Sequence, residues 1–377
     1  RHRLDPLAAM TPCMGHRTAM TPCMGHRTAM TPVRGLVAAV LAFTVVVAMV
    51  TGCGRGDQRV TAWVDEEVTF VADGLTVHGT YRHHGDGTAP AALLISESGR
   101  TDRDGDNNVA GPVGNMRQLA EYLSGRGVSS LRYDKVGTGA TGLGRYAANP
   151  ADVGSAVYTA GARAAIRFLA AQPGTDADRI SVYALGEGTV HAMTLAADTA
   201  AGAPAIHSVG LLQPLPARYL DLISNRVNAD MAAAVRAGTK TQQQADAVQA
   251  AWRAAVTQAR TTGTAPTGLP DGLSAILNPG NVKAVVEADG IDPLRLAAGI
   301  PAGTPVLLSC SDSDGQADCA DMSPLRDALA HTALQVAELA GVNHVLRDDP
   351  TDNVGNYARQ DPLSAQLTSA LDEFVTK

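Results

Sequence analysis

The string Ala-Leu-Gly-Glu-Gly at residues 184–188 lies where a buried apolar run meets a helical segment. A nucleophile exposed on such a tight strand-to-helix turn needs small residues two positions before and two positions after it. Ala184 and Gly188 meet this requirement when the nucleophile position is 186, whereas a nucleophile at Glu187 would be flanked by larger residues. The predicted nucleophile position is therefore Gly186, which has no side-chain oxygen or sulfur for nucleophilic catalysis.

A second glycine-rich string, at residues 137–142, matches the G-x-G-x-x-G pattern that binds dinucleotides. That function requires a helix to open at the glycines and an acidic residue about twenty positions later, at the end of the next strand. Here the chain continues through a polar segment to Pro150, so we predict a loop instead. The adjacent pair His83 and His84 has no further ligands spaced to complete a metal site. We therefore expect no cofactor and no metal.

The elements that would position these residues alternate along the chain. A hairpin is predicted over 68–81, because apolar and polar residues alternate around Asp73 and Gly74. A continuous apolar run, typical of a strand buried on both faces, occurs at 91–95, and further strands are predicted at 128–133, 180–185, 208–212, 305–308 and 334–339. Helical spacing occurs at 116–123, 153–169, 322–330 and 363–375. This alternation predicts an α/β fold with a mostly parallel central sheet.

The alternation stops between residues 213 and 296. Residues 228–260 have a helical and mostly polar pattern, and a stretch rich in Gly, Pro and Thr follows at 261–270. We interpret this part of the chain as a helical insertion over the sheet and not as a separate domain.

Short strings along the body of the chain resemble those of bacterial α/β-hydrolases of the esterase and serine-peptidase-like branch. The matching strings are 97–105, 132–139, 184–188, Asp292-Pro293, 305–307 with 311–317, and Asn343-His344. Their order and spacing agree with the family pattern from about Val68 to the C-terminus. The resemblance implies an α/β-hydrolase fold with a mostly parallel central sheet, flanking helices and a helical lid insertion at about 213–296.

The same resemblance implies roles for individual residues. Asp314 matches the acid and His344 matches the base of a catalytic triad, in which the acid orients the imidazole and stabilises its charged form. The backbone N–H groups of Ser98 and Glu187 match the donors that stabilise a developing oxyanion.

Alternatives stay open at some of these positions. Asp312 or Asp318 could be the acid in place of Asp314, and His344 could be an ordinary surface histidine. His191, on the predicted helix after the turn, fits a packing or exposed position better than a catalytic one.

The chain departs from the family pattern at three positions. Gly186 replaces the nucleophile serine, Glu97 replaces the first glycine of the oxyanion string, and Val136 replaces an arginine. A carboxylate beside an oxyanion hole would oppose the negative charge that the hole stabilises, unless the side chain points away.

The missing serine separates two functional hypotheses. Removing the nucleophile from such a unit lowers kcat by on the order of a millionfold. We therefore expect a catalytically impaired α/β-hydrolase that serves as a binding or accessory protein for a small acyl or peptide ligand. The alternative is an active hydrolase of esters, thioesters or peptides, in which Asp314 and His344 activate water or another hydroxyl such as that of Ser98 is the nucleophile.

The N-terminal region begins with a repeat. A ten-residue string runs twice from Met10 and begins again at Met30. We interpret residues 1–29 as a duplicated leader outside the folded protein, and we predict that translation starts at Met30.

The segment after Met30 indicates export. Residues 30–52 combine a basic start with a short apolar run, which is typical of a signal peptide. Its end resembles the bacterial lipobox, which implies cleavage before Cys53 and attachment of a lipid to that residue. We therefore expect a lipid anchor on the outer face of the cell membrane, a tether at 53–66 and a hydrolase domain at 67–377.

Charge and cysteine positions add two expectations. The formal net charge of −7 gives no basic surface for nucleic acid. The body of the chain contains Cys310 and Cys319, and two such cysteines can form a disulfide in an exported protein. A buried free thiol with an exposed partner is the alternative.

Overall fold

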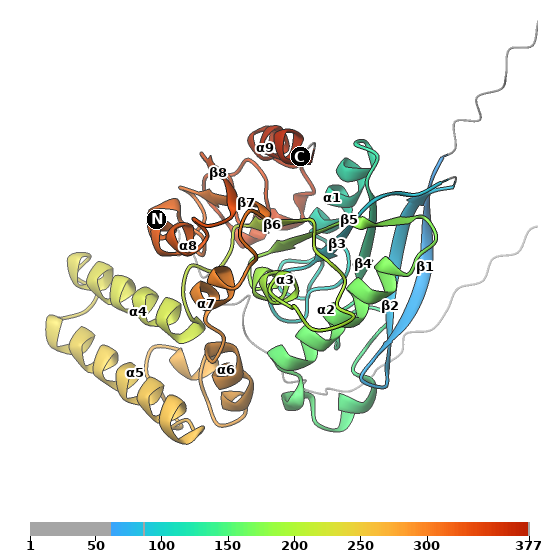
Figure 1. The fold of residues 1–377 in the computed structure, drawn as a ribbon. Coiled ribbons are helices and arrows are strands. Elements are labelled where there is room, and N and C mark those ends of the chain that lie inside the picture. The colour runs from blue at the N-terminus through green and yellow to red at the C-terminus, as the bar shows by residue number, and fades with distance from the viewer. Residues whose placement is uncertain (1–61, 86, 376–377) are drawn as a thin grey trace, which may run out of the picture. The chain divides into compact units, whose positions relative to one another are not determined.

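The computed structural model describes residues 62–85 and 87–375. The duplicated leader, the predicted signal peptide and Cys53 lie outside the described residues. One eight-stranded sheet forms the centre of the described part, in the order β1-β2-β4-β3-β5-β6-β7-β8 (Figure 1). The six strands from β4 to β8 in this order run parallel, whereas β1 and β2 pair antiparallel at one edge. This arrangement confirms the predicted mostly parallel sheet.

The strands and helices follow one another along the chain much as the sequence predicts. The strands are β1 (Trp63–Ala72), β2 (Leu75–His84), β3 (Ala89–Ile95), β4 (Ser129–Tyr133), β5 (Thr175–Leu185), β6 (Ser208–Leu212), β7 (Pro305–Ser311) and β8 (Ala333–Leu339). The helices are α1 (Asn115–Ser124), α2 (Ser155–Ala170), α3 (Gly188–Ala196), α4 (Tyr219–Arg236), α5 (Gln242–Thr262), α6 (Val282–Asp289), α7 (Pro293–Ala298), α8 (Ser323–Ala328) and α9 (Ala365–Val375).

The turn between β1 and β2 shows why the hairpin could be predicted. Asp73 and Gly74 both adopt positive φ, at 47° and 77°. Two such residues form the tight turn whose twist matches a hairpin, and an Asp-Gly pair adopts it readily. The register pairs Ala72 with Leu75 directly across the turn.

Both faces of the sheet are covered by helices, which form two apolar layers. Leu93 and Leu94 of β3 are both almost fully buried and belong to different layers, because successive strand residues point to opposite faces. One layer includes side chains of α2, α3, α7 and α8, and the other includes side chains of α1 and α9. A strand buried on both faces favours apolar residues at successive positions, as at 91–95 in β3.

The insertion between β6 and β7 is helical, as the sequence predicts. The predicted helical segment 228–260 spans two helices, because α4 ends and α5 begins within it. Gly238 adopts a φ of +68° after α4, and Thr241 caps the start of α5 in a reciprocal pair of hydrogen bonds with Gln244. Figure 1 shows α4 and α5 side by side, and their apolar faces, including the buried Trp252, pack on each other.

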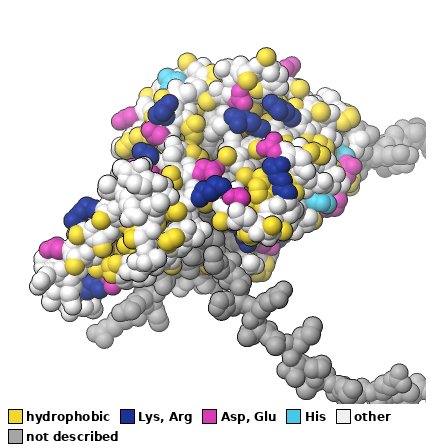
Figure 2. All heavy atoms as spheres, turned by 90° about the horizontal axis from the view of Figure 1, so that it is seen from below, with side chains coloured by type: hydrophobic (Ala, Val, Ile, Leu, Met, Phe, Trp, Pro, Cys, Tyr) yellow, Lys and Arg dark blue, Asp and Glu magenta, His cyan; other side chains and the backbone are white. Residues whose placement is uncertain are grey.

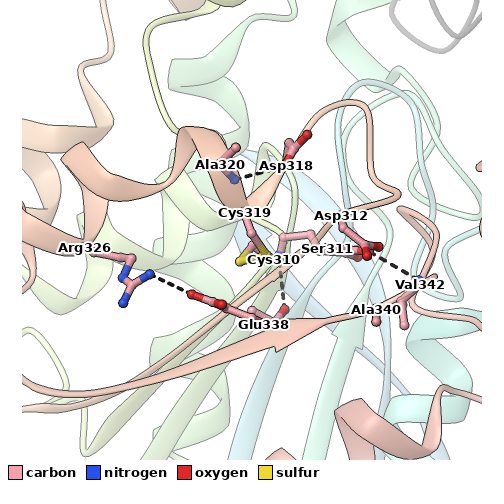
Figure 3. Close-up of a disulfide and its surroundings, with 12 residues drawn as sticks. Cys310, Ser311, Asp312, Asp318, Cys319, Ala320, Arg326, Glu338, Ala340 and Val342 are labelled. Carbon is pink, nitrogen blue, oxygen red and sulfur yellow. Dashed lines mark hydrogen bonds and ion pairs between the residues drawn. A yellow bond between two sulfur atoms is a disulfide. The ribbon is translucent and has the colours of Figure 1, made fainter.

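A disulfide joins Cys310 and Cys319, with their Cα atoms 4.9 Å apart. Cys310 lies in β7 and Cys319 begins a short 3-10 helix, as Figure 3 shows. The bond therefore closes the loop 311–318, which carries all three candidate acids. Of the two arrangements that the sequence left open, the structure has the paired cysteines.

Three further properties of the described residues concern surface charge, membrane-spanning helices and metal-binding groups. Figure 2 shows Lys, Arg, Asp and Glu side chains interspersed on one face, without a large area of a single charge. None of the helices in the described residues is both long and apolar enough to span a membrane. Within the same residues, no three or more His, Cys, Asp or Glu side chains form a metal-binding group.

Candidate functional site

The candidate site lies at the carboxyl ends of the parallel strands, where ligands bind in open α/β sheets. The loops that build it are 96–99 after β3, 186–188 after β5, 312–318 after β7 and 340–344 after β8. The carboxylate of Glu187 accepts the N–H of Gly99, so the first two loops touch each other. Because these strands are neighbours or near neighbours in one sheet, residues far apart in the sequence meet here.

The turn at Gly186 has the geometry of a nucleophile position. Gly186 adopts a φ of +55°, and its N–H donates to the carbonyl of Leu212 at 3.1 Å. A Cβ atom at Gly188 would lie 2.7 Å from the carbonyl oxygen of Ser96 and 2.9 Å from that of Ile95. Backbone atoms cannot yield as a flexible side chain can, so position 188 must be glycine. This contact is the physical reason for the small residue that the sequence analysis used to choose position 186.

The structure brings His344 and Asp314 together. The imidazole Nδ1 of His344 lies 2.8 Å from Oδ2 of Asp314, and both residues are 1% exposed. The other two candidate acids are occupied elsewhere: Asp312 accepts the N–H of Gly341, and Asp318 caps a 3-10 helix. Of the three, Asp314 is therefore the carboxylate that can orient the imidazole.

The other imidazole nitrogen of His344 is also occupied. Its Nε2 atom lies 3.1 Å from Oε2 of Glu97, whose side chain is nearly buried. A Cβ atom built on Gly186 would lie 3.0 Å from the same Nε2 atom and 3.6 Å from Cβ of Glu97. The carboxylate of Glu97 therefore pairs with the nitrogen that a nucleophile at position 186 would use. Glu97 points into the site and not away from it.

Two carboxylates on one imidazole determine its charge. Burial alone would lower the pKa of His344, but Asp314 and then Glu97 outweigh this effect and raise the pKa well above its usual value. The raised pKa favours the imidazolium form of the ring, in which each ring nitrogen carries a proton toward one of the two carboxylates. An imidazolium has no free lone pair, so in this arrangement His344 cannot accept a proton as a general base.

Replacing Glu97 by Gln is expected to lower the pKa of His344, because the amide keeps the side-chain shape and removes one of the two negative charges. A histidine whose pKa rises on folding stabilises the folded state fully below the unfolded value of about 6.5, and this stabilisation is lost as the pH rises through the raised value. The free energy of unfolding of the wild type should therefore fall with rising pH above about 6.5, and that of Glu97→Gln should fall less.

An NMR titration of the His344 ring measures this effect directly. Glu338→Gln is a matched control, because Glu338 pairs with Arg326 on the surface. The control should leave the titration of His344 unchanged. A Glu97→Gln protein with the wild-type titration curve would contradict the ion pair.

A second buried pair of charges supports the Glu97 loop. The ammonium of Lys135 donates to the backbone carbonyl of Glu97. Burial lowers the pKa of Lys135 to about 8, although Glu187 and Glu97 act in the opposite direction. Burial also raises the pKa of Glu187, and Lys135 and the N–H of Gly99 partly offset this. These contacts link the loops that carry the two predicted oxyanion donors, Ser98 and Glu187.

Two residues that position the His344 loop were missed by the sequence analysis. Asp352 accepts the N–H of His344 at 2.9 Å and the N–H of Gly315 at 3.2 Å, so it ties the base loop to the acid loop. Gln213, which has a φ of +44°, donates to the carbonyl of Asn343 at 3.1 Å. Neither belongs to a recognisable motif, and no pattern in the sequence singles them out.

The remaining candidates lie outside the His344 cluster. Among the described residues, Ser98 forms no hydrogen bond with His344. His191 is buried, and its Nδ1 atom lies 2.9 Å from the hydroxyl of Thr159. Burial, together with the charge of Lys135, lowers the pKa of His191 to about 3, so its ring is neutral. The glycine-rich string 137–142 forms turns and no helix opens there, which agrees with the predicted loop.

Comparisons with solved structures identify the fold. The chain is similar to the Pyrococcus furiosus esterase Pf2001, with 14% identity over 86% of this chain and 94% of that chain and a TM-score of 0.51. It is also similar to the α/β hydrolase GrgF from Penicillium sp. sh18, with 16% identity over 84% of this chain and 100% of that chain and a TM-score of 0.50. A third similar structure is that of DcsB in complex with its substrate analogue, with 13% identity over 84% of this chain and 99% of that chain and a TM-score of 0.51.

These similarities and the sheet order establish that the described residues have the α/β-hydrolase fold. No protein-family model and no curated protein matches the chain. The activity therefore has to be argued from the site itself.

Proposed function

We propose that the chain is a membrane-anchored lipoprotein of the α/β-hydrolase fold whose hydrolase site is catalytically impaired, and that it serves as a binding or accessory protein. The observation that carries this proposal is the ion pair between Glu97 and His344 beside Gly186. The site thus has a carboxylate where a hydrolase would have the hydroxyl of its nucleophile.

Three physical reasons make acyl transfer at this site unfavourable. Gly186 has no nucleophilic atom, so no acyl-enzyme can form at the turn. His344 is held protonated and cannot accept a proton from water or from a hydroxyl. The negative charge of Glu97 would also repel an oxyanion developing beside it, in a buried environment where such repulsion is strong.

Space near the turn is equally restricted. A cavity beside Glu187, also lined by Val190, Leu215 and Tyr219, has a volume of about 20 Å³. This volume holds about one water molecule. The space beside Glu187 is therefore too small to hold an acyl substrate.

The contact between Asp314 and His344 favours the alternative function, an active hydrolase of esters, thioesters or peptides in which this pair activates water. That function requires Glu97 to leave Nε2, so that the ring can lose its proton. The sequence of the signal peptide supports the proposed lipid anchor on Cys53 and the proposed location on the outer face of the cell membrane. The proposed ligand is a small acyl or peptide molecule.

Ester hydrolysis by the wild type and by His344→Ala tests the impaired site. We expect short and medium p-nitrophenyl esters to be hydrolysed at the same background rate by both proteins across neutral pH. A wild-type rate that is well above background and is abolished in His344→Ala would contradict the proposal and favour the activated-water alternative. Asp312→Ala serves as the control, because Asp312 lies in the same loop as Asp314 but its carboxylate accepts the N–H of Gly341 and forms no hydrogen bond with His344.

A further inference from the structure

A second and larger pocket lies outside the His344 site. It has a volume of about 480 Å³ and lies between α2, α3, α6 and α7. These helices contact one another in pairs, α2 with α3, α2 with α6, and α3 with α7, and Figure 1 shows them grouped on one side of the sheet. The volume is within the range of about 300–1,000 Å³ that is typical of pockets for small molecules.

This pocket borders the small cavity beside Glu187 but is distinct from it. Ser155 and Ile291 line both spaces, so only these two side chains are shared between them. The small cavity holds about one water molecule, so a ligand would lie in the larger pocket alone. A ligand there would not need to displace Glu97 from His344.

The acidic side chains of the pocket are already engaged. The carboxylate of Glu287 accepts the backbone N–H of Ala156 at the start of α2. The carboxylate of Asp292 caps α7 by accepting the N–H of Leu294 at 3.0 Å. Both carboxylates therefore accept backbone N–H groups at helix N-termini, where negative charge is favourable.

Of the two basic side chains that line the pocket, Arg163 and Arg295, only Arg295 is without an ion pair among the described residues. Arg163 pairs at 3.3 Å with Asp198, and both lie partly exposed. Arg295 lines the pocket and is exposed, and within the described residues it forms no ion pair. A guanidinium without an acidic partner at the mouth of a pocket offers up to two parallel hydrogen bonds to a planar anion.

The rest of the lining is apolar or carries hydroxyl groups. Leu296 and Ile291 provide apolar surface, while Thr159 and Thr194 provide hydroxyls. The hydroxyl of Thr194 donates to a backbone carbonyl of its own helix, so its oxygen can still accept. A ligand that fits this combination has one anionic group and a short apolar chain.

We propose that this pocket binds a small organic monocarboxylic acid, with its carboxylate on Arg295 and its chain against Leu296 and Ile291. The proposal deepens the proposed function and rests on it, since it gives the binding protein a ligand class and a site for it.

Calorimetric titration of the full chain with three six-carbon probes tests the proposal. Hexanoate has the proposed anionic group, hexanol is neutral and hexylamine is cationic. We expect hexanoate to bind at least tenfold more tightly than hexanol, and hexylamine to bind more weakly than either. Arg295→Gln should weaken hexanoate binding at least tenfold and remove the preference over hexanol. Arg326→Gln should leave both affinities unchanged, because Arg326 pairs with Glu338 and does not line the pocket.

Three outcomes would overturn the proposal: absence of hexanoate binding, hexylamine binding as tightly as hexanoate, or an affinity for hexanoate that Arg295→Gln does not change. A folded Arg295→Gln protein, checked by its melting temperature, makes the last outcome decisive. None of these results depends on turnover, so they are distinguishable from failure of the proposed function, which would appear as ester hydrolysis by the wild type.

Discussion

Replacing Gly186 by Ser and Glu97 by Gly together is expected to convert the protein into an ester hydrolase, with a rate at least about a thousandfold above that of the wild type. The nucleophile of such a unit contributes on the order of a millionfold to kcat, so a gain of this size requires only part of a working site. The first substitution places a Cβ atom 3.0 Å from Nε2 of His344, so it brings a hydroxyl next to that nitrogen. The second frees that nitrogen.

Either substitution alone should give much less. With Gly186→Ser, Glu97 still holds Nε2, so the hydroxyl lacks a general base and the rate falls short of the double variant by about 10²–10⁴. The serine also adopts a φ of +55°, which costs about 1–2 kcal/mol of stability. With Glu97→Gly, the base is free but no nucleophile is present.

Hydrolysis of p-nitrophenyl esters by the four proteins measures this prediction. A triple variant that adds His344→Ala to the double variant is the matched control and should return to background. If Gly186→Ser alone equals the double variant, then Glu97 does not block the site. If a well-folded double variant stays silent, then the missing serine and the ion pair do not explain the impairment.

Replacing Asp289 by Ala is expected to lower the free energy of unfolding by about 3 kcal/mol, the largest stability effect that we predict. Asp289 is 1% exposed and lies where three helices of the insertion meet. It accepts the N–H of Leu220 at 2.9 Å, and it forms ion pairs with Arg218 at 3.0 Å and Arg260 at 2.8 Å. The variant leaves a buried N–H and two arginines without this acceptor.

Asp289 should also make the free energy of unfolding depend on pH in the acid range. Burial alone would raise the pKa of Asp289, but the hydrogen bonds from Arg260 and Leu220 outweigh it and hold the pKa below its usual value. Its stabilisation is therefore present above the unfolded value of about 3.9 and is lost as the pH falls through the lower folded value. The difference in unfolding free energy between wild type and Asp289→Ala should shrink in that range.

Urea unfolding at several pH values measures both effects. Asp221→Ala is the control, because Asp221 also pairs with Arg260, at 2.7 Å, but is about half exposed. A surface pair of this kind contributes about 0–1 kcal/mol. Equal losses in the two variants would show that the buried network does not hold the insertion together.

The fold was largely predictable, because both of its main signals are local in the sequence. Buried strands of a parallel sheet are continuous apolar runs, and the Asp73-Gly74 turn determines the hairpin by its φ angles alone. The sequence predicted that the insertion is helical but did not locate the break between α4 and α5, because Ala-rich and polar residues continue across it. Only Gly238 and the cap at Thr241 indicate it, and both are weak signals inside a long helical pattern.

The site was predictable in part, for a different reason. The close approach of Gly188 to the carbonyl of Ser96 leaves a sequence signature, so the register of the turn could be inferred. The sequence showed that Glu97 departs from the family pattern, but the direction of its side chain depends on packing between distant loops. The contacts of Asp352 and Gln213 join segments far apart in the chain, and no local pattern encodes them.

Labelling with a fluorophosphonate probe, read by peptide mass spectrometry, tests the central claim most directly, because the probe reacts only with a hydroxyl activated in its site. The wild type and the two single variants should remain unlabelled or nearly so. The double variant should be labelled at position 186, and adding His344→Ala should abolish that label. Labelling of the wild type at Ser98 or at any other hydroxyl, dependent on His344, would contradict an impaired site and identify the protein as an active hydrolase with a different nucleophile.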